Sequence, residues 1–368
     1  MTSRSIQLVI FRADASTRIG TGHVTRCLTL AKTLSLHGAE IVFVCRPADG
    51  DLIDQIKASG LEVLSVPCDD TRYGNESTEF DLLGGDWQTD AQQCLSMLSA
   101  YRQADWLIVD HYSLDARWER MVRPVAKRIM VVDDLANRPH DCDYLLDQTY
   151  GEDGSRYHGL LPADCKTLLG TSYALLKPEF AMARGQLAKK TLPVDPKIVH
   201  VFFGGTDVHA NTLRFSTLLL ENFLGIHLKV VVGRGSTFEP ELTRLANCYG
   251  SRLSWRKGIA TMAEYMSSCD IAIGAPGMTT WERACLGIPA TYIAVSKNQV
   301  AILEQLAMRG LCLFLGVDHD ITDGQFVSAF DSFLGDHARL VAMRERGMAA
   351  VDGLGVERVS EVFSAIPL

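Results

Sequence analysis

Residues 12–30 combine ionisable side chains with two glycines in a pattern that fits catalysis. An apolar run at 8–11 precedes them with the continuous hydrophobicity of a buried parallel strand, and 27–34 follow with helical spacing. The stretch therefore predicts a strand, a loop and the start of a helix. Gly20 and Gly22 permit positive φ and a close approach of backbone to ligand, which a loop needs if its amides are to face an anion.

His23 lies at the expected mouth of this helix, where the positive end of the dipole favours neutral imidazole, the form that accepts a proton. Arg12, Asp14, Arg18 and Arg26 accompany it around one strand end, where open α/β sheets bind ligands. Together they predict general-base chemistry, with a capping or packing histidine as the alternative.

The composition is that of a globular protein with more than one domain. A chain of 368 residues is longer than one hydrophobic core usually supports. The formal net charge of −8 argues against general binding to nucleic acid or anionic membranes. The ten cysteines show no ligand spacing and indicate reduced core thiols. With no signal peptide or long apolar run visible, we expect a cytoplasmic protein.

Strands that alternate with helical segments must position the ionisable residues. Apolar runs predict strands at 8–11, 40–45, 61–66, 104–109, 128–132, 145–146, 198–203, 227–232, 253–255, 271–273, 290–295 and 311–315. Such alternation predicts parallel sheets with crossovers. Because the carboxyl ends of parallel strands share one edge, we expect several polar residues to converge, namely His23, Asp110, His111, Tyr112 and Asp133.

The expected fold class is α/β, with two Rossmann-like, doubly wound domains. The proline-containing segment 189–197 is the expected linker, which gives domains at 1–190 and 191–368. The last helical stretch, 337–365, is a candidate to pack back onto the first domain. The loop at 69–86 and the region after 316 carry no motif to which we assign a role.

Two glycine-rich turns in the second half are suited to a nucleotide diphosphate. The GGTD turn offers amides and a hydroxyl before a helix, although an ordinary tight connection explains it equally well in isolation. A second turn opens a helix in GAPGMTTWERACLG, where we expect a glutamate to hold ribose hydroxyls or simply to favour the helix dipole. The candidate ligand-binding residues are Gly204, Gly205, Thr206, Gly277, Met278, Thr279, Thr280, Glu282, Asn298 and Gln299.

The motifs taken together resemble a known family. RADASTRIGTGHVTRCLTLA, VDHY, VDDLANR, CDYLLDQ, TSYALLKPEF, FFGGTD, MTTWERACLGIPA and KNQ are similar, in this order, to the UDP-2,4-diacetamido-2,4,6-trideoxy-β-L-altropyranose hydrolases of pseudaminic acid biosynthesis. The general pattern also resembles the GT-B architecture of the peptidoglycan N-acetylglucosaminyltransferase. This resemblance implies two domains that face each other across a cleft.

The resemblance also implies a reaction in which water attacks the anomeric carbon and UDP leaves with inversion, without a metal or other cofactor. His23 would lie at the catalytic water or anomeric centre, Glu282 would bind the ribose, and the backbone at Ile259 would read the uracil. From the residues themselves, either Asp14 or Asp110 could orient His23, and Tyr112 is a candidate for positioning substrate or water. Gly20, Gly22 and Arg12 are further candidates for contacts with the substrate.

Three other functions fit the same residues. A GT-B glycosyltransferase would use the same donor, a nucleotide-sugar-binding protein would lack chemistry altogether, and a hydrolysing 2-epimerase would also release UDP. Residue types do not define the stereochemistry of the sugar. We expect a small-molecule UDP-sugar as ligand, no nucleic-acid or membrane partner, and a monomer.

Overall fold

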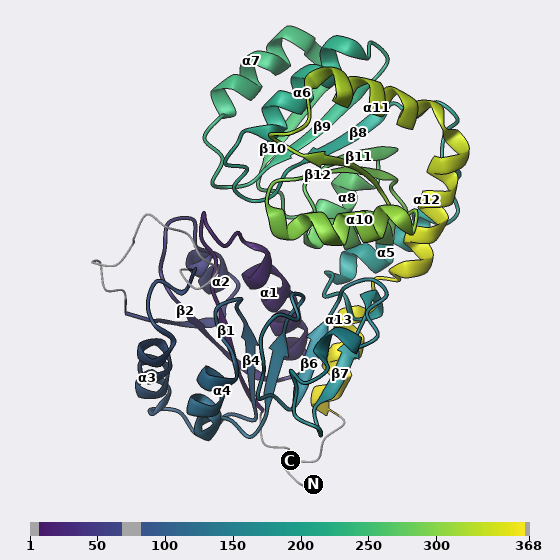
Figure 1. Cartoon of the computed structure of the whole chain (residues 1–368). Helices are drawn as coiled ribbons and strands as arrows, with labels where there is room; N and C mark the ends of the chain where they lie inside the picture. The colour runs from purple at the N-terminus through teal and green to yellow at the C-terminus, as the bar shows by residue number, and fades with distance from the viewer. Residues whose placement is uncertain (1–6, 68–81, 365–368) are drawn as a thin grey trace. The chain divides into compact units, whose positions relative to one another are not determined.

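The computed structural model describes residues 7–67 and 82–364, and the chain forms two compact units (Figure 1). The first unit extends to Leu175 and takes in the chain again from Gly355, and the second comprises Leu176–Leu354. The chain enters the second unit upstream of the segment 189–197, because α5 (Pro178–Leu187) packs on α9 (Met278–Leu286) of that unit. Most of the loop expected at 69–86 lies outside the described residues.

The first unit is built on a seven-stranded parallel sheet in the order β3-β2-β1-β4-β5-β6-β7. Its strands are β1 (Leu8–Ala13), β2 (Glu40–Cys45), β3 (Glu62–Ser65), β4 (Trp106–Asp110), β5 (Ile129–Val132), β6 (Tyr144–Asp147) and β7 (Lys166–Leu169). The central strands are continuous apolar runs because both faces of the sheet are covered. The six expected strands are confirmed, and β7 is an additional edge strand.

Helices cover both faces of this sheet. One core contains side chains of α1 (Gly22–Leu36), α2 (Ile53–Ala58) and α13 (Gly355–Ser364), and the other contains those of α3 (Trp87–Leu98) and α4 (Ala116–Val122). The single helical stretch expected at 337–365 is wrong in detail. It consists of α12 (His337–Ala350) and α13, interrupted before Gly353, whose positive φ of 84° does not continue a helix.

The second unit contains a six-stranded parallel sheet in the order β10-β9-β8-β11-β12-β13. All six expected strands of this half are confirmed, as β8 (Ile198–Phe202), β9 (His227–Val232), β10 (Leu253–Lys257), β11 (Ile271–Gly274), β12 (Ala290–Ala294) and β13 (Leu313–Val317). The helices are α5, α6 (Asn211–Asn222), α7 (Glu239–Tyr249), α8 (Met262–Met266), α9, α10 (Val300–Met308), α11 (Asp323–Gly335) and α12.

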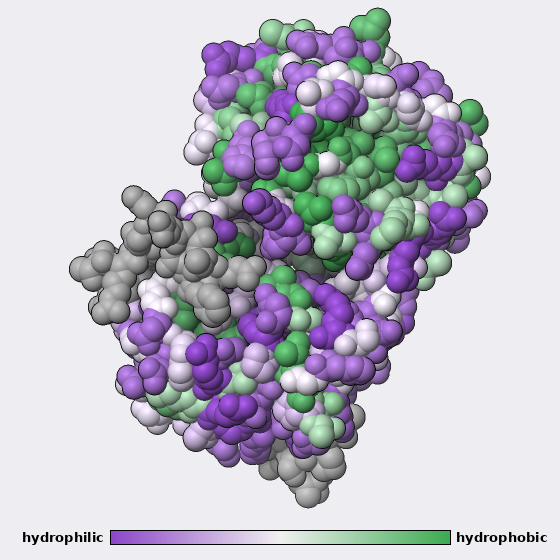
Figure 2. All heavy atoms as spheres, viewed as in Figure 1, coloured by the Kyte–Doolittle hydropathy of each residue, from purple (hydrophilic) through white to green (hydrophobic). Residues whose placement is uncertain are grey.

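The surface of the second unit includes an apolar area. Figure 2 shows hydrophobic residues in the region framed by α10, α11 and α12. The edge strand β13 contributes to the second unit's exposed surface, since all five of its residues are only partly buried.

Within residues 7–67 and 82–364, no helix combines the length and apolar character needed to cross a bilayer. The nine cysteines in this part of the chain are free thiols, and seven are buried, as expected for core cysteines.

Candidate functional site

His23 and Asp110 form a short, buried pair at the carboxyl edge of the first sheet. His23 is the second residue of α1, and Asp110 is the last residue of β4. His23 Nδ1 lies 2.5 Å from Asp110 Oδ1. Because a carboxylate oxygen can only accept, this bond assigns the proton to Nδ1 and leaves Nε2 as the proton acceptor. The arrangement is that of an oriented general base.

Arg26 fixes Asp110 from one turn further along α1. Its Nε and Nη2 donate to the two oxygens of Asp110 over 2.6 and 2.7 Å. Burial raises the pKa of the Asp110 carboxyl, but the charges and hydrogen bonds of Arg26 and His23 together outweigh burial and hold this pKa well below its usual range. Asp110 therefore stays ionised, in an ion pair with Arg26.

Tyr112 and Asp134 complete this cluster. The rings of His23 and Tyr112 meet edge to face with centroids 4.4 Å apart. The Tyr112 hydroxyl donates to Asp134 Oδ1 over 3.0 Å, and Asp134 also accepts from Arg26 Nη1 over 3.0 Å. Burial, reinforced by the charge of Asp134, raises the pKa of the Tyr112 hydroxyl. Tyr112 is thus a neutral group whose ring positions the imidazole.

Asp14 and Arg12 belong to a separate buried network. Arg12 donates to Asp14 over 2.5 Å and to Asp90 over 2.8 Å, and its side chain is only 1% exposed. Asp14 Oδ1 also accepts from the amide of Arg46 over 2.7 Å. Burial opposes ionisation of Asp14, but Arg12 holds the pKa of this carboxyl well below its usual range. These contacts favour a structural role for Asp14 and Arg12 rather than the orientation of His23 or binding of a phosphate.

Two residues expected beside His23 have other partners. His111 Nε2 lies 3.4 Å from Asp14 Oδ2, so His111 joins the Arg12 network. Asp133 accepts from Arg138 over 2.7 Å and from the Tyr157 hydroxyl over 3.1 Å. The strand ends therefore gather three adjacent networks rather than one cluster.

The glycines of the RIGTGH segment differ in conformation. Gly20 has a φ of +81°, as expected for a turn residue. Gly22 is already the first residue of α1 and has no positive φ, so the expectation for Gly22 is wrong because the helix begins earlier than the apolar spacing indicated. A Cβ at either position would meet no atom within 4 Å, which leaves open space beside the His23 loop.

In the second unit the GGTD turn follows β8, with Gly204 at a φ of +101°. Helix α6 begins only at Asn211, and the Asp207 carboxylate accepts from the amides of Asn211 and Thr212 over 2.9 and 2.8 Å. This capping occupies the helix N-terminus. A diphosphate at this turn would therefore be contacted by Gly204, Gly205 and Thr206, and not by the capped N-terminus of α6.

The second turn passes directly into α9. Gly277, at a φ of +133°, is the N-cap, and Met278, Thr279 and Thr280 form the first turn. Glu282 is the fifth residue of α9 and lies beyond its first turn, where a carboxylate gains little from the helix dipole. Burial raises the pKa of the half-buried Glu282 carboxyl to about 7, although the charges of Lys177 and Arg283 oppose this shift.

The remaining candidates lie after two other strands of the same sheet. Partly buried Ile259 follows β10 after Gly258, and Asn298 and Gln299 lie in a 3₁₀ turn after β12. Gln299 Oε1 accepts from the amide of Val295 over 2.9 Å, while Asn298 is exposed. The second-half candidates therefore lie in the segments that follow strands of the second unit, except Glu282, which lies in the second turn of α9.

Backbone crowding explains two glycines at this edge that sequence reasoning left unassigned. A Cβ on Gly233 would lie 1.7 Å from the carbonyl oxygen of Gly205, and one on Gly274 would lie 1.8 Å from that of Phe202. The loops after β8 and β9 thus approach each other at backbone distance, and the last residues of β8 and β11 pair closely in the sheet. Other residues not predicted are Asp90, Arg46 and Trp118, whose partners come from distant segments and leave no local signal.

The described ranges 7–67 and 82–364 contain no group of three or more His, Cys, Asp or Glu side chains arranged to hold a metal ion.

The two parallel Rossmann-like sheets define a GT-B fold, as expected. MurG of Acinetobacter baumannii shares it, with a TM-score of 0.65 and 15% identity, covering 98% of this chain and 100% of that one. UGT71G1 of Medicago truncatula in complex with UDP-glucose gives a TM-score of 0.66 at 11% identity, covering 99% and 100%. At these identities the likeness concerns the fold alone.

Similarity in sequence extends to several curated proteins. The UDP-2,4-diacetamido-2,4,6-trideoxy-β-L-altropyranose hydrolase of Campylobacter jejuni is 28% identical over 305 residues, 82% of this chain and 97% of that protein. The spore coat polysaccharide biosynthesis protein SpsG of Bacillus subtilis is 23% identical over 314 residues, 82% of this chain and 90% of that protein. No protein-family profile matches the chain.

Proposed function

We propose that this chain is a UDP-sugar hydrolase that releases UDP and free 2,4-diacetamido-2,4,6-trideoxy-L-altrose, with inversion, in pseudaminic acid biosynthesis. The observation that carries the proposal is the 2.5 Å pair of His23 and Asp110, which leaves an oriented proton acceptor at a strand edge. Similarity to the Campylobacter jejuni hydrolase over 97% of its length supports the choice of substrate.

The first unit activates water in this mechanism. His23 Nε2 takes a proton from the water as its oxygen bonds to the anomeric carbon, and the bond between that carbon and the UDP oxygen breaks. Ionised Asp110 stabilises the imidazolium that forms, while Arg26 and Tyr112 hold the two groups in place. The proton then passes to solvent.

The second unit binds the leaving group. The amides of Gly204 and Gly205 and the N-terminus of α9 take up the charge that develops on UDP, so the departing oxygen needs no separate acid. Glu282 accepts hydrogen bonds from the ribose hydroxyls, and the backbone at Ile259 contacts the uracil. Asn298 and Gln299 offer amides to the sugar.

The proposal is tested by substituting His23. His23→Ala should lower kcat by roughly 10²- to 10⁴-fold, because the base is lost, and should leave the Kd for UDP unchanged within about threefold. His37→Ala, an exposed histidine just after α1, is the matched control and should keep wild-type kcat. Substantial turnover by the His23 variant would show that His23 is not the base.

A glycosyltransferase is the second candidate, favoured by the GT-B fold shared with MurG. It would use the same donor site but would transfer the sugar to an acceptor instead of water. UDP release that depends on an added acceptor would support this activity. Binding of the UDP-sugar without UDP release under either condition would support a non-catalytic role.

A further inference from the structure

Arg283 is a fully buried cation in α9 with an incomplete set of partners. Its side chain is 0% exposed. Nη2 donates to the carbonyl oxygens of Phe202 and Ile273 over 3.2 and 3.1 Å. Nε and Nη1 are buried and have no hydrogen-bond partner among the residues that the structure describes. Three of the five N–H groups of this guanidinium, one on Nε and two on Nη1, therefore have no acceptor among the described residues.

No carboxylate oxygen lies within 4.0 Å of Arg283 in the described part of the chain, and its guanidinium carbon lies 5.2 Å from the centre of the Tyr292 ring, whose face attracts a cation. The nearby His200 is fully buried, and burial, followed by the charge of Arg283, holds its pKa well below the usual value. His200 is thus neutral. The Tyr292 ring and two carbonyl oxygens offset only part of the cost of burying this charge, so an anionic ligand nearby would be a favourable further partner.

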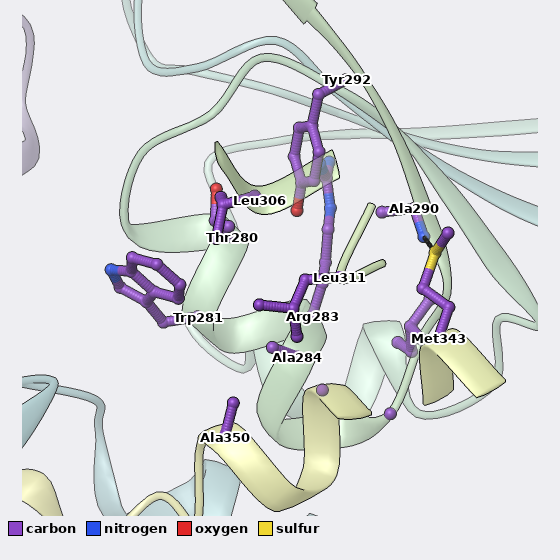
Figure 3. Close-up of a pocket in the computed structure, with 13 residues that line it drawn as sticks. Thr280, Trp281, Arg283, Ala284, Ala290, Tyr292, Leu306, Leu311, Met343 and Ala350 are labelled. Carbon is purple, nitrogen blue, oxygen red and sulfur yellow. Dashed lines mark hydrogen bonds between the residues drawn. The ribbon is translucent and has the colours of Figure 1, made fainter. Parts of the chain in front are cut away.

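The lining of the cavity beside Arg283 contains no acidic side chain. Figure 3 shows Arg283 extending from α9 towards Tyr292, with Thr280 at the start of the same helix. The cavity that these side chains line measures about 20 Å³, which is room for a water molecule. The remaining lining is largely apolar, with Leu306 and Met343 among it. A neutral water does not balance the charge.

The carbonyl partners of Arg283 belong to the ends of the two strands that lead into the glycine-rich turns. Phe202 is the last residue of β8, just before Gly204, and Ile273 is the penultimate residue of β11, just before the turn that reaches Gly277. A Cβ on Gly274 would lie 2.7 Å from Arg283 Nη2, so the guanidinium also contacts the second turn. Arg283 links the bases of both turns to α9.

We propose that Arg283 is a positioning residue for the diphosphate of the bound nucleotide. It fixes the bases of the turns that carry Gly204 and Gly277, and its buried positive charge stabilises the negative diphosphate from beneath them. This role rests on the proposed function, because it needs a nucleoside diphosphate at these turns. A neutral nucleoside would gain little from it, since the charge acts on the phosphates.

Calorimetric titration of UDP and of uridine into the full-length protein tests this role, with the thermal midpoint as a second readout. Arg283→Met should weaken UDP binding by about tenfold and uridine binding by less than about threefold. A cooperative thermal transition of Arg283→Met shows that its weaker UDP binding is not a loss of folded protein. Arg283→Lys, which restores the charge, should bind UDP within about threefold of wild type.

Arg252→Met is the matched control. The hydrogen bonds that Arg252 donates also go to backbone carbonyls, those of Leu220, Phe223 and Ile226. These lie at and after the C-terminal end of α6, away from the glycine-rich turns. The substitution should therefore leave UDP binding unchanged within about threefold. If Arg283→Met does not fold, Arg283→Gln replaces it as the charge-removing variant.

Equal weakening of UDP and uridine by Arg283→Met, or unchanged UDP binding, would overturn the inference and leave the proposed function standing. A Lys variant as weak as the Met variant would also overturn the electrostatic role. A wild-type protein that binds no UDP would overturn both the inference and the proposed function.

Discussion

At the scale of single residues, the account depends on which acid orients His23. Sequence alone left Asp14 and Asp110 as equal candidates, since both follow buried strands. Geometry separates them, because Asp110 lies 2.5 Å from His23 while Asp14 accepts from Arg12 and from the amide of Arg46. The choice between Asp14 and Asp110 depends on where each side chain points at the end of its strand. The spacing of residues in the sequence does not specify this direction.

Asp110→Asn should therefore lower kcat by roughly 10²-fold or more, because the amide no longer holds the Nδ1–H tautomer or stabilises the imidazolium. Asp14→Asn is the matched control and should keep kcat within about tenfold of wild type. Steady-state kinetics of UDP release measures both. The reverse ranking would transfer the orienting role to Asp14.

Glu282 gives a prediction of pH dependence. Burial raises the pKa of its carboxyl to about 7, and only the ionised form accepts hydrogen bonds from both ribose hydroxyls. Uridine affinity should then increase as the pH rises from about 6 to about 8, by up to about tenfold. Isothermal titration of uridine measures this change, and Glu282→Gln should remove it.

Stability should show the opposite trend. The pKa of Glu282 in the folded state lies above its usual value, so the folded protein holds this proton more tightly than the unfolded chain does. The stabilising contribution of the Glu282 proton is complete below the unfolded pKa and is lost as the pH rises through about 7.

Uridine affinity that stays flat or falls between about pH 6 and 8 would contradict a role for Glu282 as a ribose ligand.

At the level of the elements, the close contact between the loops after β8 and β9 predicts that a side chain on Gly233 disturbs the Gly204–Gly205 turn. Gly233→Ala would place a Cβ 1.7 Å from Gly205 O, so the Gly204–Gly205 backbone must shift. We expect UDP affinity to fall by at least about tenfold, together with a loss of stability of roughly 1–3 kcal/mol. Titration calorimetry and thermal denaturation measure the two effects.

Gly235→Ala is the control, because the nearest atom to its Cβ would be Gly205 O at 3.9 Å, an ordinary contact. It should change neither UDP affinity nor stability appreciably. Normal UDP binding by Gly233→Ala would show that the Gly204–Gly205 turn does not contact the ligand.

The elements also show what the sequence could predict. Strands β2 and β9 have the bounds expected from their apolar runs, since a buried parallel strand must be apolar on both faces. Strand β7 was missed because it is an edge strand whose KTLL segment is mostly exposed and lacks such a run. The site was predictable where it follows strand ends, and not where distant side chains such as Asp90 complete a network.

At the scale of the whole chain, the return of the C-terminal helix to the first unit has a measurable consequence. Phe363 of α13 packs on Trp106 of β4, with ring centroids 4.5 Å apart, and is 1% exposed. Phe363→Ala should destabilise the first unit by about 3–5 kcal/mol, because it leaves a cavity at the centre of that core. Chemical denaturation followed by tryptophan fluorescence measures this loss.

Leu36→Ala is the control for the same unit, since Leu36 is 87% exposed at the end of α1 and its truncation should change stability by less than about 0.5 kcal/mol. Equal stability of the Phe363 and Leu36 variants would show that α13 is not an integral part of the first unit.

The most direct test of the whole account follows UDP release and the liberated sugar by NMR, with purified protein and UDP-2,4-diacetamido-2,4,6-trideoxy-β-L-altropyranose, in the presence of EDTA and without any acceptor. A hydrolase with His23 as base should release UDP and the free sugar in equal amounts, with the sugar appearing first in the inverted anomeric configuration. An intact substrate, or UDP release only after an acceptor is added, would contradict it.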